Sequence, residues 1–149
     1  MTEDIEATKI VVAKALIRDD EGRFLVLRES EGRDKHTSGK WEIPGGRLKV
    51  GEDRYEAARR EVKEELNIDV KDPQDVVRIE VESDHLVSCY IVAFGGFQGE
   101  PEIRLDEKHS EHRWVTADEF MELDWHSDAG YDIVPMKHLD DYLDRNNVY

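Results

Sequence analysis

Three glutamates, Glu61, Glu64 and Glu65, stand close together in the segment "EVKEELNI", which has the composition of a helix. Side chains at i, i+3 and i+4 share one helix face, and like charges at that spacing destabilise an isolated helix. Carboxylate oxygens on a rigid surface are also the ligands that Mg²⁺ and Mn²⁺ prefer. The spacing therefore has two interpretations, a solvated acidic face or a site for a divalent cation.

A helical wheel of residues 53–66 separates three faces. One face is acidic, one is apolar, and the third mixes both signs of charge. The mixed face already supplies a solvated side, so segregation of the glutamates beside the apolar face favours the cation site. The preceding loop, "PGGRLKVGED", contains Gly45, Gly46 and Gly51. Glycine lets the main chain approach a ligand closely, so this loop and the helix together predict a metal site.

The spacing of these residues follows a longer pattern. Gly46 is followed by five residues, Glu52, seven residues and then "REVKEELNI". This resembles the Nudix box, Gly-x5-Glu-x7-Arg-Glu-U-x-Glu-Glu-x-Gly-U, in which U is aliphatic. The one departure is Asn67, which stands in place of a glycine. We interpret Asn67 as the left-handed cap of the helix, a conformation that asparagine tolerates. The resemblance covers residues 8–143.

The resemblance implies a fold, a reaction and a set of metal ligands. The fold is α+β, an α/β/α sandwich with a mixed β-sheet between helices, as a single domain over 1–149. Nudix enzymes hydrolyse a nucleoside diphosphate linked to another moiety, with a divalent metal holding the pyrophosphate. The implied ligands are Glu61, Glu64, Glu65 and the carbonyl of Gly46, with Mg²⁺ as the ion and Mn²⁺ as the alternative. Glu61 is either a ligand or the general base.

The remaining box residues and one late acid complete the implied catalytic group. Arg60 and Glu52 orient the site, although Glu52 also suits a first-turn acid favoured by the helix dipole. The late acid is Glu107 in "LDEKHSEHRWV", with Glu111 and a plain loop surface as alternatives.

Two further residues are candidates for contact with substrate. Arg28 is expected to meet the phosphates, or to be a solvated arginine at a strand end. Trp41 is expected to stack on the base, or to pack in the core. His109 and His112 have no cysteine partners nearby, which argues against a zinc site.

The substrate class is inferred from features outside the box. The sequence signatures that distinguish ADP-ribose, dinucleoside-polyphosphate and coenzyme A hydrolases within the family are missing or fragmentary here. Their absence favours a nucleoside-triphosphate pyrophosphohydrolase. Hydrolysis of ADP-ribose, nucleotide sugars or dinucleoside polyphosphates remains an alternative. A binding module without catalysis is the rival class, but such modules usually lose the acids that this chain keeps.

The composition of the chain limits the kinds of partner and the cellular setting that we expect for it. The 149-residue chain has a net charge of −15, which argues against binding of nucleic acid. No apolar run reaches the ~20 residues of a membrane span. A single cysteine, Cys89, fits a reducing cytoplasmic setting. The expected partner is a small-molecule nucleotide, and the oligomeric state stays open, a homodimer included.

Hydrophobic patterning predicts the elements that position these residues. Residues 53–66 form the helix, and a capping box at Thr116 starts a second, brief helix. The other predicted elements are a hairpin of strands 10–18 and 23–29, strands 76–83 and 86–94, the short strand "HRWV" and a C-terminal amphipathic helix over 132–146.

Overall fold

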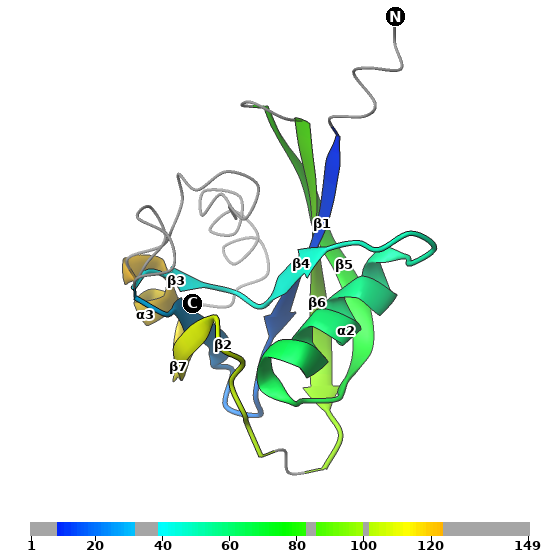
Figure 1. Cartoon of the computed structure of the whole chain (residues 1–149). Coiled ribbons are helices and arrows are strands. Elements are labelled where there is room, and N and C mark those ends of the chain that lie inside the picture. The colour runs from blue at the N-terminus through cyan, green and yellow to red at the C-terminus, as the bar shows by residue number, and fades with distance from the viewer. Residues whose placement is uncertain (1–8, 32–38, 83–85, 100–101, 124–149) are drawn as a thin grey trace, which may run out of the picture.

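The computed structural model describes residues 9–31, 39–82, 86–99 and 102–123. The predicted C-terminal helix lies outside these ranges. No helix among the described residues has the length and apolar character of a membrane span. The described elements are β1 (Ile10–Ile17), β2 (Phe24–Glu29), β3 (Trp41–Glu42), β4 (Gly45–Arg47), α2 (Arg54–Leu66), β5 (Val70–Glu82), β6 (Leu86–Phe97), β7 (His109–Val115) and α3 (Ala117–Glu122) (Figure 1).

The strands form two sheets. A four-stranded sheet has the order β4-β1-β6-β5, and a three-stranded sheet has the order β3-β2-β7. Strands β1 and β6 run parallel, whereas β4 pairs with β1 and β5 pairs with β6 in antiparallel register. The larger sheet is therefore mixed, and with α2 packed against it the described fold is α+β, as predicted.

Two apolar cores lie on opposite sides of β1 because its side chains alternate. Ala13, Ala15 and Ile17 belong to the core that contains the apolar side chains of α2. Val12 and Leu16 belong to a second core, which reaches β2, β3 and Phe120 of α3. In Figure 1, α2 lies along the four-stranded sheet, and α3 lies next to the three-stranded sheet.

Helix α2 has a defined cap at each end. Asp53 and Glu56 form a capping box, in which each side chain accepts from the other residue's main-chain N–H. At the other end Asn67 has φ 62° and ψ 35°, and its N–H donates to the carbonyl of Lys63. The predicted helix and the left-handed cap at Asn67 are both confirmed.

The predicted hairpin of the first two strands is wrong, although both strands exist. Strand β1 lies in the four-stranded sheet and β2 in the three-stranded one, and an isolated bridge between Arg18 and Phe24 joins their adjoining ends without a continuing ladder. Both strands are largely buried. Each therefore needs partners on both edges, and segments distant in sequence supply them.

The segment "WEIPGG" passes from one sheet to the other. Its first two residues form β3 beside β2, and Gly45 begins β4 beside β1. Between them, the carbonyl of Pro44 accepts from the N–H of Ala15. This crossing brings both sheets to the beginning of the glycine loop and to the C-terminal half of α2.

Candidate active site

Arg60 joins the glycine loop to the acidic face of α2. Its guanidinium donates to both carboxylate oxygens of Glu52, at 2.6 and 3.0 Å, and to the carbonyl of Arg47 at 3.0 Å. It also donates to Glu61 at 3.1 Å and to Glu64 at 3.3 Å. The guanidinium is thus fully engaged with protein, and it fixes the loop and two carboxylates relative to one another.

Glu61 lies against the main chain of Gly46. A Cβ on Gly46 would meet the carboxyl carbon and one carboxylate oxygen of Glu61 at 2.6 Å. The missing side chain therefore makes room for a carboxylate next to the Gly46 backbone. This places a charged oxygen donor and a main-chain carbonyl in the same small region.

Glu65 is buried beside the neighbouring glycine. One carboxylate oxygen accepts from the N–H of Gly45 at 2.9 Å. Gly45 has φ +142°, and a Cβ there would lie 2.3 Å from the carbonyl oxygen of Ala13. Only glycine fits this position, and its close approach to β1 brings its N–H to Glu65. Glu64 lies half-exposed on the same helix, with Arg60 as its partner.

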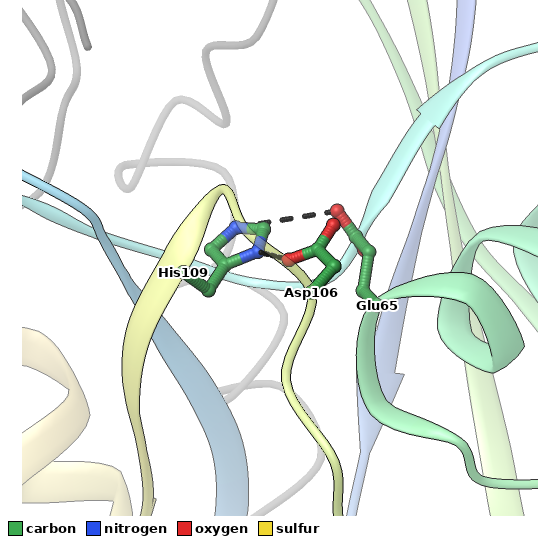
Figure 2. A group of neighbouring side chains, drawn as sticks. All are labelled: Glu65, Asp106 and His109. Carbon is green, nitrogen blue, oxygen red and sulfur yellow. Dashed lines mark hydrogen bonds and ion pairs between the residues drawn. The ribbon is translucent and has the colours of Figure 1, made fainter.

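A buried network of charged side chains surrounds Glu65. His109 contacts Asp106 through Nδ1 and Glu42 through Nε2, both at 2.7 Å, and its Nε2 lies 4.0 Å from Glu65. Lys14 donates to Glu42 at 2.8 Å. Figure 2 shows the side chains of Glu65, Asp106 and His109 converging from α2, from the segment before β7 and from β7.

Burial and charge shift the pKa values of this network. Burial raises the pKa of Glu65 to about 8, although Lys14 and His109 oppose the shift. Burial alone would lower the pKa of His109, but its hydrogen bonds and charge interactions with Glu42, Glu65 and Asp106 raise it to about 9. Shifts of this size are common at functional sites.

Glu52 shows the opposite shift. Its hydrogen bonds from Arg60, together with one from the Lys49 N–H, lower its pKa to about 2. Glu52 is therefore ionised at neutral pH and serves as the partner that holds Arg60. This is the orienting arrangement expected from the sequence, although the consequence for catalysis stays a prediction.

The structure brings most predicted site residues together, but not the late acid. Glu107 has an exposed side chain, and its carbonyl accepts from the hydroxyl of Ser30. The adjacent Asp106 lies beside Glu65 instead. The alternative acid, Glu111, pairs with Arg113 and Arg28 on the three-stranded sheet. A catalytic role for Glu107 stays a prediction that this geometry does not favour.

The predicted substrate contacts lie on the three-stranded sheet. Arg28 is about two-fifths exposed and donates to the carbonyl of Gly39 at 2.8 Å, so part of its charge faces solvent. Trp41 is buried in the core, with the guanidinium of Arg113 4.6 Å from its ring centre. Of the two roles considered for Trp41, the structure favours core packing, and base stacking stays a prediction.

Sequence reasoning missed the buried network. The sequence suggests only a disfavoured zinc site for His109, and it indicates no role for Lys14, Glu42 or Asp106. One signal was available: a lysine inside the apolar run "VVAKALI" requires a buried carboxylate partner. Sequence alone does not identify Glu42 as that partner, because the pairing depends on the crossing between the sheets.

The residues present fit a divalent cation. Glu61 and Glu65 offer carboxylate oxygens against the main chain of Gly45 and Gly46, and hard oxygen donors suit Mg²⁺ and Mn²⁺. Glu65, Asp106 and His109 also place one potential ligand atom each within 4.8 Å of one another. The burial that raises the pKa of Glu65 makes a bound cation favourable, because it would offset a negative charge with little access to water.

Known proteins resemble this chain along most of its length. The sequence model of the NUDIX domain matches residues 8–135. The chain is 35% identical over 121 residues to the putative 8-oxo-dGTP diphosphatase 2 of Mycobacterium tuberculosis. The aligned region covers 78% of this chain and 79% of that protein. The chain is also 28% identical over 94 residues to the 8-oxo-dGTP diphosphatase of Escherichia coli, covering 62% and 71% respectively.

A solved structure has a similar fold over almost the whole chain. The crystal structure of the MutT protein from Methanosarcina mazei Go1 matches with a TM-score of 0.75 and 27% identity, covering 95% of this chain and 96% of that one. The match of the domain over residues 8–135 agrees with the resemblance found in the glycine–glutamate pattern. This chain belongs to the Nudix family and is a Nudix hydrolase that acts on phosphorus-containing anhydrides.

Proposed function

We propose that this protein is a Mg²⁺-dependent pyrophosphohydrolase that cleaves a nucleoside triphosphate to the monophosphate and pyrophosphate, with Mn²⁺ able to replace Mg²⁺. One observation carries the proposal. Glu61 and Glu65, one helical turn apart, place their carboxylates against the main chain of adjacent glycines, and Arg60 fixes that loop to the helix. Nudix hydrolases generally use divalent metals, and this arrangement offers the oxygen donors that such metals need.

Each part of the site has a defined task under this proposal. Glu61, Glu65 and the Gly46 carbonyl hold the cation, and Glu64 lies at the solvent side of the same face. When bound, the cation neutralises the pyrophosphate and makes its phosphorus open to attack by water. Arg60 and Glu52 keep the glycine loop in place, so that the carboxylates need no reorganisation when substrate arrives.

The relatives suggest which triphosphate to test first. Two of them carry the name 8-oxo-dGTP diphosphatase. We therefore extend the proposal to purine deoxynucleoside triphosphates with an oxidised base. Arg28, partly exposed on β2, is the cation we expect to meet the phosphates. The net charge of −15 would repel a triphosphate, which makes a metal complex the reasonable form of the substrate.

Hydrolysis assays with product identification test the proposal. Purified protein is incubated with 8-oxo-dGTP, dGTP, the other nucleoside triphosphates, ADP-ribose, a dinucleoside tetraphosphate and a nucleotide sugar, each with Mg²⁺ or with EDTA. Phosphorus NMR then distinguishes pyrophosphate from inorganic phosphate. We expect 8-oxo-dGTP to give monophosphate and pyrophosphate only when Mg²⁺ is present. Release of inorganic phosphate, or cleavage of ADP-ribose with no triphosphate turned over, would contradict the proposal.

A further inference from the structure

His109 occupies an unusual position at the start of β7. Its side chain is 1% exposed, and both ring nitrogens lie 2.7 Å from a carboxylate oxygen. The two carboxylates come from different parts of the chain, Glu42 from β3 and Asp106 from the segment before β7. The imidazole therefore links β3 to that segment beside Glu65 of α2.

The contacts of His109 determine its hydrogen-bonding state. An ionised carboxylate only accepts hydrogen bonds, so a ring with a carboxylate on each nitrogen donates from both. A doubly donating imidazole is a cation and has no lone pair for a metal ion. His109 is therefore unsuited to be a ligand in this arrangement, even though its ring lies within 4.8 Å of the Glu65 and Asp106 oxygens.

The segment that carries Asp106 is fixed at a second place, the end of α2. The N–H of Asp106 donates to the carbonyl of Glu65 at 3.2 Å, and the N–H of Arg104 donates to the carbonyl of Leu66 at 3.0 Å. These bonds satisfy carbonyls that a helix end leaves without partners. The main chain of Asp106 is thus set by α2, and the direction of its carboxylate is set by His109.

Charge makes this link necessary. Glu42, Glu65 and Asp106 are three carboxylates in a mostly buried region, with Lys14 and His109 as the cations beside them. Without His109, the carboxylates of Asp106 and Glu42 would lose their shared partner and repel each other, and each would turn toward water. Lys14 donates to Glu42 and to the Ile43 carbonyl, whereas His109 contacts both Glu42 and Asp106.

We propose that His109 is a positioning residue, which holds the carboxylates of Asp106 and Glu42 in fixed places around Glu65 and does not itself bind the cation. Asp106 is then the late acid of the site, one residue before the Glu107 that the sequence favours. The inference rests on the proposed metal-dependent hydrolysis. It assigns roles to two residues outside the glycine–glutamate pattern of residues 46–68.

Kinetics of four variants test the role of His109. The variants are His109→Asn, Asp106→Asn, the double variant, and His112→Asn as a control on the same strand. Loss of a residue that orients a metal ligand typically reduces activity or metal affinity by about 10- to 100-fold. We expect a fall of that size in kcat for both single variants, with KM little changed. The double variant should lose no more than the worse single variant, because His109 acts through Asp106.

Two measurements that need no turnover complete the test. Direct titration with Mn²⁺ should show weaker binding to His109→Asn and Asp106→Asn, and unchanged binding to His112→Asn. The ¹⁵N shifts of the His109 ring in the metal-free protein should show both nitrogens protonated, and should stay so when Mg²⁺ is added. Thermal unfolding in EDTA shows whether each variant is folded. Since Asp106 is only partly buried, Asp106→Asn remains informative if His109→Asn does not fold.

The outcomes separate this inference from the proposed function. If the wild type hydrolyses no triphosphate, the proposed function fails, while Mn²⁺ binding and the ¹⁵N shifts still report on His109. If the wild type is active but His109→Asn and Asp106→Asn keep full kcat and Mn²⁺ affinity, the positioning role is wrong. An unprotonated His109 nitrogen that shifts on addition of Mg²⁺ would make His109 a ligand, and would overturn the inference as well.

Discussion

The main chain of Gly46 and the carboxylate of Glu61 are in direct contact, so closely that a methyl group on Gly46 would lie 2.6 Å from the carboxyl carbon. Gly46 lies in β4 and Glu61 lies in α2, yet the position of the Glu61 carboxylate depends on the absence of a side chain at Gly46. Glu61 is also tied to Arg60 at 3.1 Å, so it can be displaced only by disturbing that bond.

Gly46→Ala should therefore reduce activity more than stability. The new methyl group meets the end of a flexible side chain rather than main chain, so Glu61 can move aside, but it then leaves the position proposed for the cation. We expect at least a tenfold loss in kcat, because loss of a group that orients a metal ligand typically reduces activity by about 10- to 100-fold. Steady-state kinetics and urea unfolding measure the two effects.

Gly96→Ala is the matched control for this substitution. Gly96 lies in β6, and a Cβ there would meet only the end of the Lys71 side chain, at 3.4 Å. This variant should keep wild-type kinetics. Wild-type activity in both variants would show that the contact between Gly46 and Glu61 has no catalytic importance.

Asn67→Ala should destabilise the protein, whereas Asn67→Gly should be nearly neutral. Asn67 has φ 62°, a left-handed conformation that costs most residues about 1–2 kcal/mol. Glycine adopts this conformation freely but loses the bond from the Asn67 side chain to the carbonyl of Glu102, which is 3.3 Å long and exposed. Urea unfolding should separate Ala from Gly by about 1 kcal/mol. Equal destabilisation by both would mean that the side-chain bond, rather than the cap, is what matters.

The pairing of Glu52 with Arg60 predicts a specific dependence of stability on pH. The pKa of Glu52 is lowered from 4.5 to about 2. A lowered carboxylate pKa contributes stability above the unfolded-state value, and that contribution disappears as the pH falls toward the folded-state value. The difference in unfolding free energy between wild type and Glu52→Gln should therefore be constant above pH 5 and shrink between pH 4.5 and 3. A difference that does not change over this range would contradict the assignment.

A divalent cation should stabilise the protein beyond the effect of ionic strength. A ligand that binds only the folded state adds RT ln(1 + [L]/Kd), or about 2.7 kcal/mol at a hundredfold excess over Kd. Millimolar Mg²⁺ or Mn²⁺ should raise the melting temperature of the wild type more than NaCl of equal ionic strength. The NaCl control is needed because screening alone stabilises a chain with a net charge of −15. The same excess in Glu61→Gln/Glu65→Gln would show that these two glutamates do not bind the cation.

Local features of this fold could be predicted from the sequence because local interactions determine them. The helix over 53–66, its cap at Asn67 and the capping box at Thr116 depend on residues within a few positions of one another, and all three are confirmed. The strands were also located, but β5 and β6 extend further than the apolar pattern does, because pairing along the sheet continues through polar residues.

Long-range pairings could not be predicted in the same way. Strands β1 and β2 follow one another as a hairpin would, yet each has its partners elsewhere in the chain. The residues around Glu65 are also brought together by pairings between strands that are distant in the sequence. Gly45 reaches Glu65 through the pairing of β4 with β1, and His109 reaches it through the pairing of β7 with β2. Asp106 rather than Glu107 faces Glu65 because hydrogen bonds to the end of α2 set the direction of that segment.

The most direct test of this account is the hydrolysis of 8-oxo-dGTP by Glu65→Gln in the presence of Mg²⁺. Glutamine keeps the shape of Glu65 and its bond from the Gly45 N–H, but removes the charge that is proposed to hold the cation. Glu80→Gln is the control, since Glu80 is exposed on β5 and pairs with Arg78. We predict that Glu65→Gln stays folded and loses about a hundredfold to a thousandfold in kcat, the scale of one key electrostatic contact in a transition state. Full activity in folded Glu65→Gln would contradict the central claim.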